Sequence, residues 1–146
     1  MPNLIQVMKK FSKLGFKFGI ISNQSVIGRG LTTVENVNRI NGFLNEIFLE
    51  NQINFEFIYI CPHVPEDDCE CRKPKTFLGK KAIEKFAIET SKSYYVGDQI
   101  SDMIFARSLK LGAIGVHNPM LNTEKCDFVA QSLGEAYEWL KERQDT

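Results

Sequence analysis

Three of the four cysteines and one of the two histidines lie within the stretch CPHVPEDDCECRKPK (61–75). Cys61, His63, Cys69 and Cys71 form a C-x-H-x5-C-x-C pattern. Three thiolates and an imidazole suit a tetrahedral Zn²⁺ site in which the protein fills every coordination position, which indicates a structural metal rather than a catalytic one. The alternatives are a surface loop with incidental cysteines and a redox pair.

Two basic residues, Arg72 and Lys73, directly follow the last cysteine of this pattern. A metal-closed loop would hold both side chains in fixed positions. Fixed cations bind anionic groups, and phosphate is the obvious candidate. The alternative is that both side chains point into solvent as a charged rim.

Two other stretches have residue types that could serve a phosphate site. Ser22, Asn23 and Gln24 follow an apolar run, and a serine hydroxyl near free backbone N–H groups can bind phosphate oxygens. Asp98 ends the apolar stretch SYYVG, where a carboxylate could bind Mg²⁺ together with water and phosphate, although it could instead cap a helix. Asp102, one helical turn later, is the better candidate for a cap or a supporting group.

Alternating strands and helices are expected to position these stretches. Apolar runs predict strands at 16–22, 55–60, 93–97, 113–116 and 127–130, and helical spacing predicts helices at 4–14, 34–48, 77–86, about 99–111 and 133–140. The segment 22–30 is expected to be a loop. This alternation predicts an α/β fold with a parallel sheet and helices on both faces, whose ligand site lies at the carboxyl ends of the strands.

Length and charge restrict the class of protein. The 146 residues are expected to form one domain (1–146), and Cys126 is interpreted as a small core residue. The 18 basic residues balance the 18 acidic ones, which argues against nucleic-acid or membrane-surface binding. No apolar run is long enough to span a bilayer and the N-terminus does not resemble a signal peptide, so a cytoplasmic location is expected.

Taken together, these motifs resemble those of the haloacid dehalogenase superfamily, in the branch that includes heptose bisphosphate and histidinol phosphate phosphatases. The resemblance covers nearly the whole chain and is carried by IISNQSVIGRG, by CPHVPEDDCECRKPK and by YYVGDQISDM. It implies a Rossmann-like three-layer sandwich, a structural Zn²⁺ in the 61–75 loop and a catalytic Mg²⁺. The implied roles are phosphate or substrate binding for Ser22, Asn23, Gln24, Arg72 and Lys73, and Mg²⁺ binding for Asp98.

The chain departs from this family in one important respect. Family members attack phosphorus with the first aspartate of a D-x-D pair on the central strand, whereas no aspartate precedes Asp67 in this sequence. Gln99 is a smaller departure, because heptose-type members often have lysine there. The sheet is therefore expected to lack its first, central strand, either because the chain is a fragment of a longer phosphatase or because it is a short protein without turnover.

The resulting hypothesis is a phosphatase of a small phosphorylated metabolite, with D-glycero-D-manno-heptose 1,7-bisphosphate as the favoured substrate and histidinol phosphate as the alternative. It would form an aspartyl-phosphate on a nucleophile outside this sequence, so the 146-residue chain alone is expected to be inactive. A non-catalytic, zinc-stapled binding or assembly protein is the alternative of another class. The full-length protein is expected to be a monomer, whereas exposed sheet edges would allow self-association of the chain as written.

Overall fold

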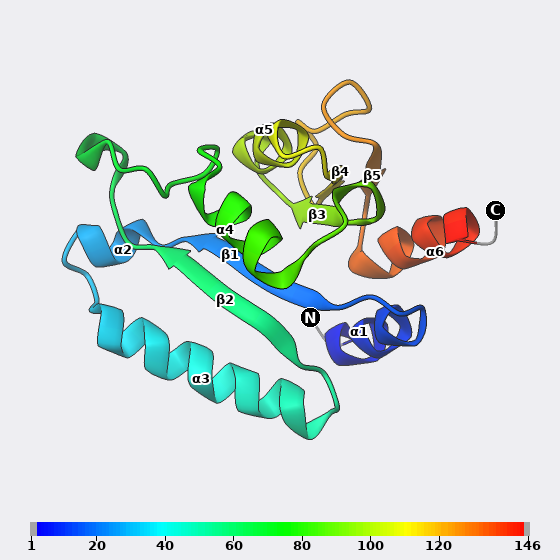
Figure 1. Cartoon of the computed structure of the whole chain (residues 1–146), viewed down its shortest axis with the longest axis horizontal. Coiled ribbons are helices and arrows are strands. Elements are labelled where there is room, and N and C mark those ends of the chain that lie inside the picture. The colour runs from blue at the N-terminus through cyan, green and yellow to red at the C-terminus, as the bar shows by residue number, and fades with distance from the viewer. Residues whose placement is uncertain (1–2, 145–146) are drawn as a thin grey trace.

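The computed structural model describes residues 3–144, which form an α/β fold (Figure 1). The strands are β1 (Phe18–Asn23), β2 (Phe55–Cys61), β3 (Tyr94–Gly97), β4 (Gly112–Val116) and β5 (Phe128–Ala130). The α-helices are α1 (Leu4–Lys13), α2 (Ser25–Gly28), α3 (Val34–Glu50), α4 (Phe77–Phe86), α5 (Ile100–Ser108) and α6 (Leu133–Gln144). Two short 3-10 helices, η1 (Pro65–Asp67) and η2 (Thr90–Lys92), lie in the connections.

All five predicted strands are present, with ends shifted by no more than two residues. The prediction of an uninterrupted loop at 22–30 was wrong, because β1 extends to Asn23 and the short helix α2 follows it. The amide of Gln24 donates to the carbonyl of Cys61 (2.7 Å), so the chain remains paired with β2 until α2 begins. This pairing places the 22–30 segment directly beside the start of the cysteine loop.

The strands form two separate parallel sheets in the described residues. One contains β1 and β2, and the other contains β3, β4 and β5 in that order. The arrows of β1, β2 and β3 point the same way in Figure 1, with β1 and β3 at the facing edges of the two sheets. The predicted α/β class with parallel strands is confirmed, and the discontinuity lies where a central strand was expected to be absent.

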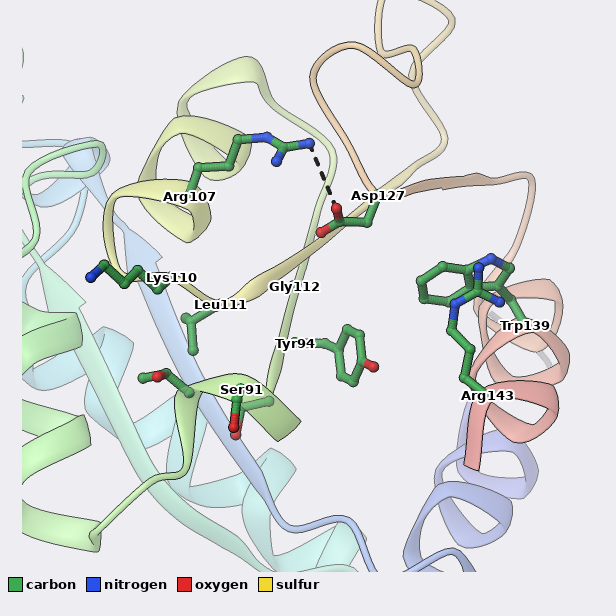
Figure 2. A pocket seen from close by; sticks show the side chains of 11 residues that line it. Ser91, Tyr94, Arg107, Lys110, Leu111, Gly112, Asp127, Trp139 and Arg143 are labelled. Atoms are coloured by element: carbon green, nitrogen blue, oxygen red, sulfur yellow. Dashed lines mark ion pairs between the residues drawn. The ribbon is translucent and has the colours of Figure 1, made fainter. Parts of the chain in front are cut away.

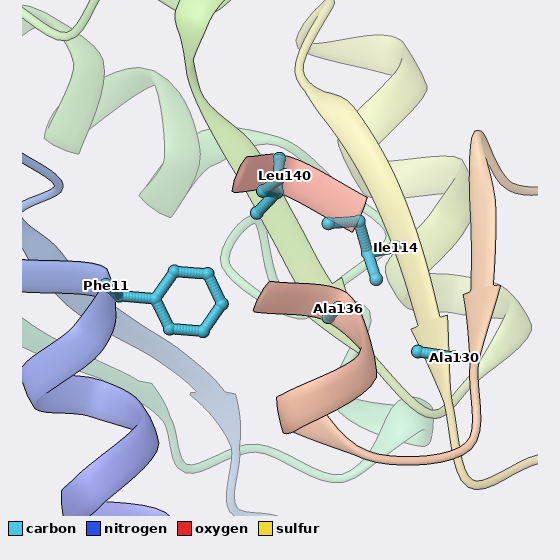
Figure 3. Packing of buried hydrophobic residues seen from close by; sticks show 5 residues of the cluster. All are labelled: Phe11, Ile114, Ala130, Ala136 and Leu140. Atoms are coloured by element: carbon cyan, nitrogen blue, oxygen red, sulfur yellow. The ribbon is translucent and has the colours of Figure 1, made fainter. Parts of the chain in front are cut away.

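The hydrophobic core surrounds the second sheet. One cluster joins helices α1 and α6 to β4 and β5, and consists of Phe11, Ile114, Ala130, Ala136 and Leu140 (Figure 3). A second cluster lies on the α5 side and consists of Met103, Ala106, Ala113, Leu121 and Cys126. Because the β4 residues Ala113 and Ile114 belong to different clusters, this sheet is covered on both faces. The prediction that Cys126 is a core residue is confirmed.

The single tryptophan, Trp139, also belongs to the second sheet. Its indole stacks on the Phe128 ring at a centroid distance of 5.0 Å and lies edge-on to Tyr94 at 6.1 Å. Among the described residues, no helix combines the length and the apolar character that crossing a bilayer requires.

Candidate functional site

The cysteine loop brings the four predicted metal ligands together. One donor atom from each of Cys61, His63, Cys69 and Cys71 lies within 4.8 Å of the other three. The Nδ1 atom of His63 is 3.4 Å from the Cys61 sulfur and 3.3 Å from the Cys71 sulfur. Cys61 is fully buried at the end of β2, which anchors one corner of the cluster to a strand.

The thiols in this cluster perturb one another's protonation. Burial and the neighbouring sulfurs of Cys61 and Cys69 raise the pKa of Cys71 to about 12. Burial also acts to raise the pKa of Cys69, but hydrogen bonds from Cys61 and from backbone N–H groups outweigh it and lower the pKa to about 7. Three adjacent thiolates repel one another, and a divalent cation would remove that repulsion by binding them all. The donor set therefore fits a metal ion such as zinc.

Lys73 connects the end of the cysteine loop to the second sheet. Its ammonium donates to the Tyr95 hydroxyl (2.8 Å) and to the Asp102 carboxylate (2.7 Å). The side chains of Lys73 and Asp102 are only 10% and 7% exposed, so this ion pair is shielded from water. Burial acts to lower the pKa of Lys73, but the interactions with Tyr95 and Asp102 outweigh it, and the pKa is raised. The lysine therefore remains charged.

Asn23 holds the backbone of Lys73 from the opposite side. Its side-chain oxygen accepts the Lys73 amide at 3.0 Å, and its side-chain nitrogen donates to the Lys73 carbonyl at 3.3 Å. At the same strand end, the Gln24 amide donates to the Ser22 hydroxyl at 2.9 Å. The first sheet thus positions Lys73 through Asn23, while Ser22 and Gln24 form a neighbouring polar pair.

Arg72 and Lys73 extend toward different acceptors. The Arg72 guanidinium donates to the His63 carbonyl at 3.4 Å and so remains with the cysteine loop, whereas the Lys73 ammonium lies against β3 and α5. The joint contact of both cations with one anion therefore stays a prediction.

Asp98 and Asp102 occupy different environments after β3. Asp102 is buried and accepts the Gln99 amide at 3.1 Å in addition to the Lys73 ammonium, so it caps α5 as its position predicted. Asp98 is exposed, and within residues 3–144 its carboxylate has no hydrogen bond or ion pair. Its carbonyl accepts from Asn118 at 2.7 Å, which ties this strand end to the segment after β4. The Asp98 carboxylate is thus available to a cation.

Tyr95 is a site residue that the sequence did not indicate. Its hydroxyl accepts from Lys73 and donates to the Ile21 carbonyl at 2.8 Å, so it connects the two sheets. Tyr95 lies inside a short apolar strand, and no motif or spacing distinguishes it from Tyr94. Its role follows from the separation of β1 and β3, which the local sequence does not encode.

A different hollow of about 520 Å³ lies beside Ser91, Gly112 and Trp139, near the starts of β3 and β4 (Figure 2). Its rim contains an Arg107–Asp127 ion pair of 3.8 Å. None of the predicted site residues lines it. Ser22, Cys61 and Asp98 instead lie at the carboxyl ends of β1, β2 and β3, where ligand sites of parallel α/β folds occur.

Comparisons with known proteins identify the family. A family model described as polynucleotide kinase 3 phosphatase matches residues 1–134. The probable D-glycero-D-manno-heptose-1,7-bisphosphate 7-phosphatase of Thermoplasma volcanium is 39% identical over 111 residues, which cover 75% of this chain and 76% of that protein. The chain belongs to the haloacid dehalogenase-like phosphatases. The predicted resemblance is therefore confirmed.

Other members of the haloacid dehalogenase-like phosphatases extend this result. The D-glycero-beta-D-manno-heptose-1,7-bisphosphate 7-phosphatase of Helicobacter pylori strain J99 is 33% identical and is covered over 80% of its length, and this match spans 94% of the chain. The bifunctional histidine biosynthesis protein HisB of Blochmanniella floridana is 35% identical, and the match spans 85% of this chain but only 35% of that protein.

A solved structure of the same fold is that of D,D-heptose 1.7-bisphosphate phosphatase from B. bronchiseptica complexed with magnesium and phosphate. It is 22% identical, with a TM-score of 0.86, and the match covers 98% of this chain and 84% of that one. At this identity the comparison establishes the fold.

Proposed function

We propose that the chain supplies the metal- and substrate-binding part of a phosphatase for D-glycero-D-manno-heptose 1,7-bisphosphate. The observation that supports the proposal is the Lys73–Asp102 ion pair, which joins the end of the cysteine loop to the helix that follows Asp98, in a chain whose relatives of comparable length are named for this substrate. The single domain predicted for residues 1–146 is part of the proposal, with the 61–75 loop as its metal-bound segment.

Zinc is the metal proposed for Cys61, His63, Cys69 and Cys71. The protein supplies all four ligands, so the ion would stabilise the loop and would leave no coordination position for a catalytic water. The loop carries Lys73 at its end, and closure by zinc would fix the position of the ammonium. The proposed role of zinc is therefore structural rather than catalytic.

Phosphate binding is proposed for the Lys73 ammonium, the Ser22 hydroxyl and the amides of Asn23 and Gln24, with Arg72 contacting the substrate. Asp98 is proposed to hold Mg²⁺, which supplies charge neutralisation of the phosphoryl oxygens. Lys73 would stabilise negative charge on the same oxygens, and Asp102 would hold the ammonium in place. Arg72 would reach the substrate by leaving its contact with the His63 carbonyl.

The covalent step requires a carboxylate nucleophile that this sequence does not contain at the expected place. A carboxylate oxygen attacks phosphorus, the sugar oxygen leaves and takes up a proton, and water then hydrolyses the aspartyl-phosphate. Asp67 and Asp68 are the first aspartates of the chain and belong to the cysteine loop rather than to a strand end. The 146-residue chain by itself is therefore proposed to be inactive.

Histidinol phosphate is the second candidate substrate. It is favoured by the HisB relatives, which are 33–37% identical to this chain, and by the five-residue gap between His63 and Cys69. A non-catalytic, zinc-stapled binding protein is the alternative of another class, and the absence of an aspartate before Asp67 favours it.

Phosphate release in the presence of Mg²⁺ separates these possibilities. The chain alone should release no phosphate above the blank from either substrate. A fusion that places an apolar strand ending in Asp-Gly-Asp ahead of Met1 should hydrolyse heptose 1,7-bisphosphate, with kcat/KM at least about tenfold above that for histidinol phosphate. The matched fusion with Asn-Gly-Asn should be inactive. Turnover by the unfused chain would contradict the assignment of the nucleophile. A higher kcat/KM for histidinol phosphate than for heptose 1,7-bisphosphate would identify histidinol phosphate as the substrate.

A further inference from the structure

The hollow of about 520 Å³ described above lies at the starts of three parallel strands. Tyr94 and Gly112 are the first residues of β3 and β4, and Asp127 directly precedes β5. Two helices also contribute to its lining: Arg107 comes from the last turn of α5, and Arg143 comes from the last turn of α6 (Figure 2). The hollow is therefore at the opposite end of β3 from the candidate site.

The charges around the hollow are unequal, although the basic and acidic residues of the whole chain balance. Among residues 3–144, its lining includes the basic side chains of Arg107, Lys110 and Arg143 and one acidic side chain, that of Asp127. Both oxygens of Asp127 are engaged: one accepts the Ala113 amide at 2.7 Å, and the other lies 3.8 Å from the Arg107 guanidinium. The lining thus has two more positive than negative charges, which favours an anionic ligand.

Arg107 is held in place by contacts that use only part of its guanidinium. Its Nε–H donates to the Lys125 carbonyl at 3.0 Å, and its Nη2 atom faces the Asp127 carboxylate. A guanidinium has five N–H groups, so those of the other terminal nitrogen can donate to an anion. Because the side chain is already ordered by these contacts, binding a ligand would cost it little conformational entropy.

An aromatic ring supports Arg143. The Cζ atom of its guanidinium lies 3.6 Å from the centroid of the Trp139 ring, and the same indole stacks on Phe128 of β5 at 5.0 Å. Stacking uses the face of a guanidinium, whereas its N–H groups lie in the plane and donate from the edge. Arg143 is therefore a second ordered cation, carried by a different helix from Arg107.

The two guanidinium groups lie on different sides of the hollow. Figure 2 shows Gly112 and Tyr94 between Arg107 and Arg143, with Ser91 below them. In the described part of the chain the hydroxyls of Ser91 and Tyr94 make no hydrogen bond, so both can bind a polar ligand. The volume falls in the range of small-molecule pockets, which leaves room for an organic frame between the two arginines.

We propose that this hollow binds a small bisphosphate, with one phosphate group at Arg107 and the other at Arg143. Phosphate monoesters carry nearly two negative charges at neutral pH, and guanidinium forks match their oxygens. The hydroxyls of Ser91 and Tyr94 would bind the polar frame that joins the phosphates. Lys110 would contribute through its charge, because its side chain extends away from Gly112 in Figure 2.

A titration followed by nuclear magnetic resonance tests the ligand class. The ¹⁵N-labelled chain is titrated with fructose 1,6-bisphosphate, fructose 6-phosphate or citrate, without Mg²⁺ and at constant ionic strength, because exposed charges are screened by salt. The bisphosphate should shift the Trp139 indole N–H and the amides of Ser91 and Gly112. It should bind at least about tenfold more tightly than the monophosphate or citrate, since only a two-ended ligand of sufficient length reaches both arginines.

Two variants of α6 test the contact itself. Arg143→Met removes one of the two forks, while the matched Lys141→Met removes the same charge from the same helical turn without changing the lining. Arg143→Met should bind fructose 1,6-bisphosphate about tenfold more weakly, close to the affinity for the monophosphate, whereas Lys141→Met should stay within about twofold of the unmodified protein. Circular dichroism checks that both variants fold.

A variant of α5 tests the other end of the ligand. Arg107→Lys keeps a positive charge beside Asp127 but loses the fork, so it should weaken binding of the bisphosphate more than binding of the monophosphate. Equal losses in Arg143→Met and Lys141→Met, or equal affinities for the bisphosphate and citrate, would overturn the proposal in favour of general anion attraction. Shifts confined to the amides of Asn23 and Asp98 would also overturn it. The proposed function uses none of the residues of this hollow, so either idea can fail without the other.

Discussion

The two sheets differ in how completely they are buried. In the β3–β5 sheet, Ala113, Ile114 and Ala130 are at most 1% exposed, because helices cover both faces. In the β1–β2 sheet, Cys61 alone among the strand residues is buried to that degree, and it belongs to the metal cluster. Apolar strand composition is therefore not sufficient for burial, which requires neighbours on both faces and at both edges.

The candidate site joins these unequal halves. Asn23 of the first sheet binds the Lys73 backbone, while the Lys73 side chain pairs with Asp102 of α5, beside the second sheet. The end of the first sheet contributes Ser22, Asn23 and Gln24, which are proposed to bind phosphate, and the end of β3 leads to the carboxylates of Asp98 and Asp102. If the halves differ in this way, the stability of the first sheet depends on its metal and its polar links, and the stability of the second sheet depends on its core.

Metal removal should have the largest effect. Chelation, or the Cys71→Ser variant, should lower Tm by about 10 °C and should expose the amides of the 61–75 loop to hydrogen exchange, because the four ligands close a loop that has little other packing. Metal analysis should find one zinc per chain in the unmodified protein and in the matched Cys126→Ala variant. Retention of zinc by Cys71→Ser would contradict the ligand assignment.

Loss of the Lys73–Asp102 ion pair, which links the two sheets, should destabilise the protein less than metal removal does. Lys73→Met leaves the Asp102 carboxylate buried without its cation and should lower the free energy of unfolding by about 3 kcal/mol at neutral pH. The matched Lys75→Met variant removes an ammonium that is exposed in the unmodified protein, so it should change the free energy of unfolding little. Urea titration followed by circular dichroism measures both, and equal effects of the two variants would argue against a structural role for the buried pair.

The same variant gives a pH signature. The pKa of Lys73 is raised in the folded state, so its contribution is fully present below its ordinary value of 10.5 and is lost as pH rises through the higher folded value. Burial raises the pKa of Tyr95, which also makes folding less favourable above pH 10. The difference in unfolding free energy between the unmodified protein and Lys73→Met should therefore narrow at alkaline pH. A constant difference would mean that the charge is not responsible.

Truncation of a core side chain should give the smallest difference in unfolding free energy between the two sheets. Ile114→Ala in β4 should cost about 3 kcal/mol, because the side chain is fully buried. Ile58→Ala in β2 should cost about 1 kcal/mol, since Ile58 is only half-buried. Denaturant titration of both variants measures the contrast, and equal costs would mean that the first sheet is as well packed as the second.

Much of the fold was predictable from periodicity. Apolar runs located the strands, and the C-x-H-x5-C-x-C spacing identified a ligand cluster that the structure brings together. Side-chain direction was less predictable: Asn23 binds the Lys73 backbone, and the Lys73 ammonium is held by Tyr95 and Asp102. These contacts depend on how the two sheets sit relative to each other, which no local pattern encodes. The short helix α2 was missed because a single turn has no recognisable periodicity.

The position of Trp139 has a practical consequence for spectroscopy. As the single indole of the chain, stacked on Phe128 of β5, it makes intrinsic fluorescence a reporter of the better-packed half alone. Melting confined to β1 and β2 would change the far-ultraviolet signal while leaving the emission spectrum nearly constant. Two optical channels recorded in one thermal scan would thus resolve whether the halves come apart in sequence or together.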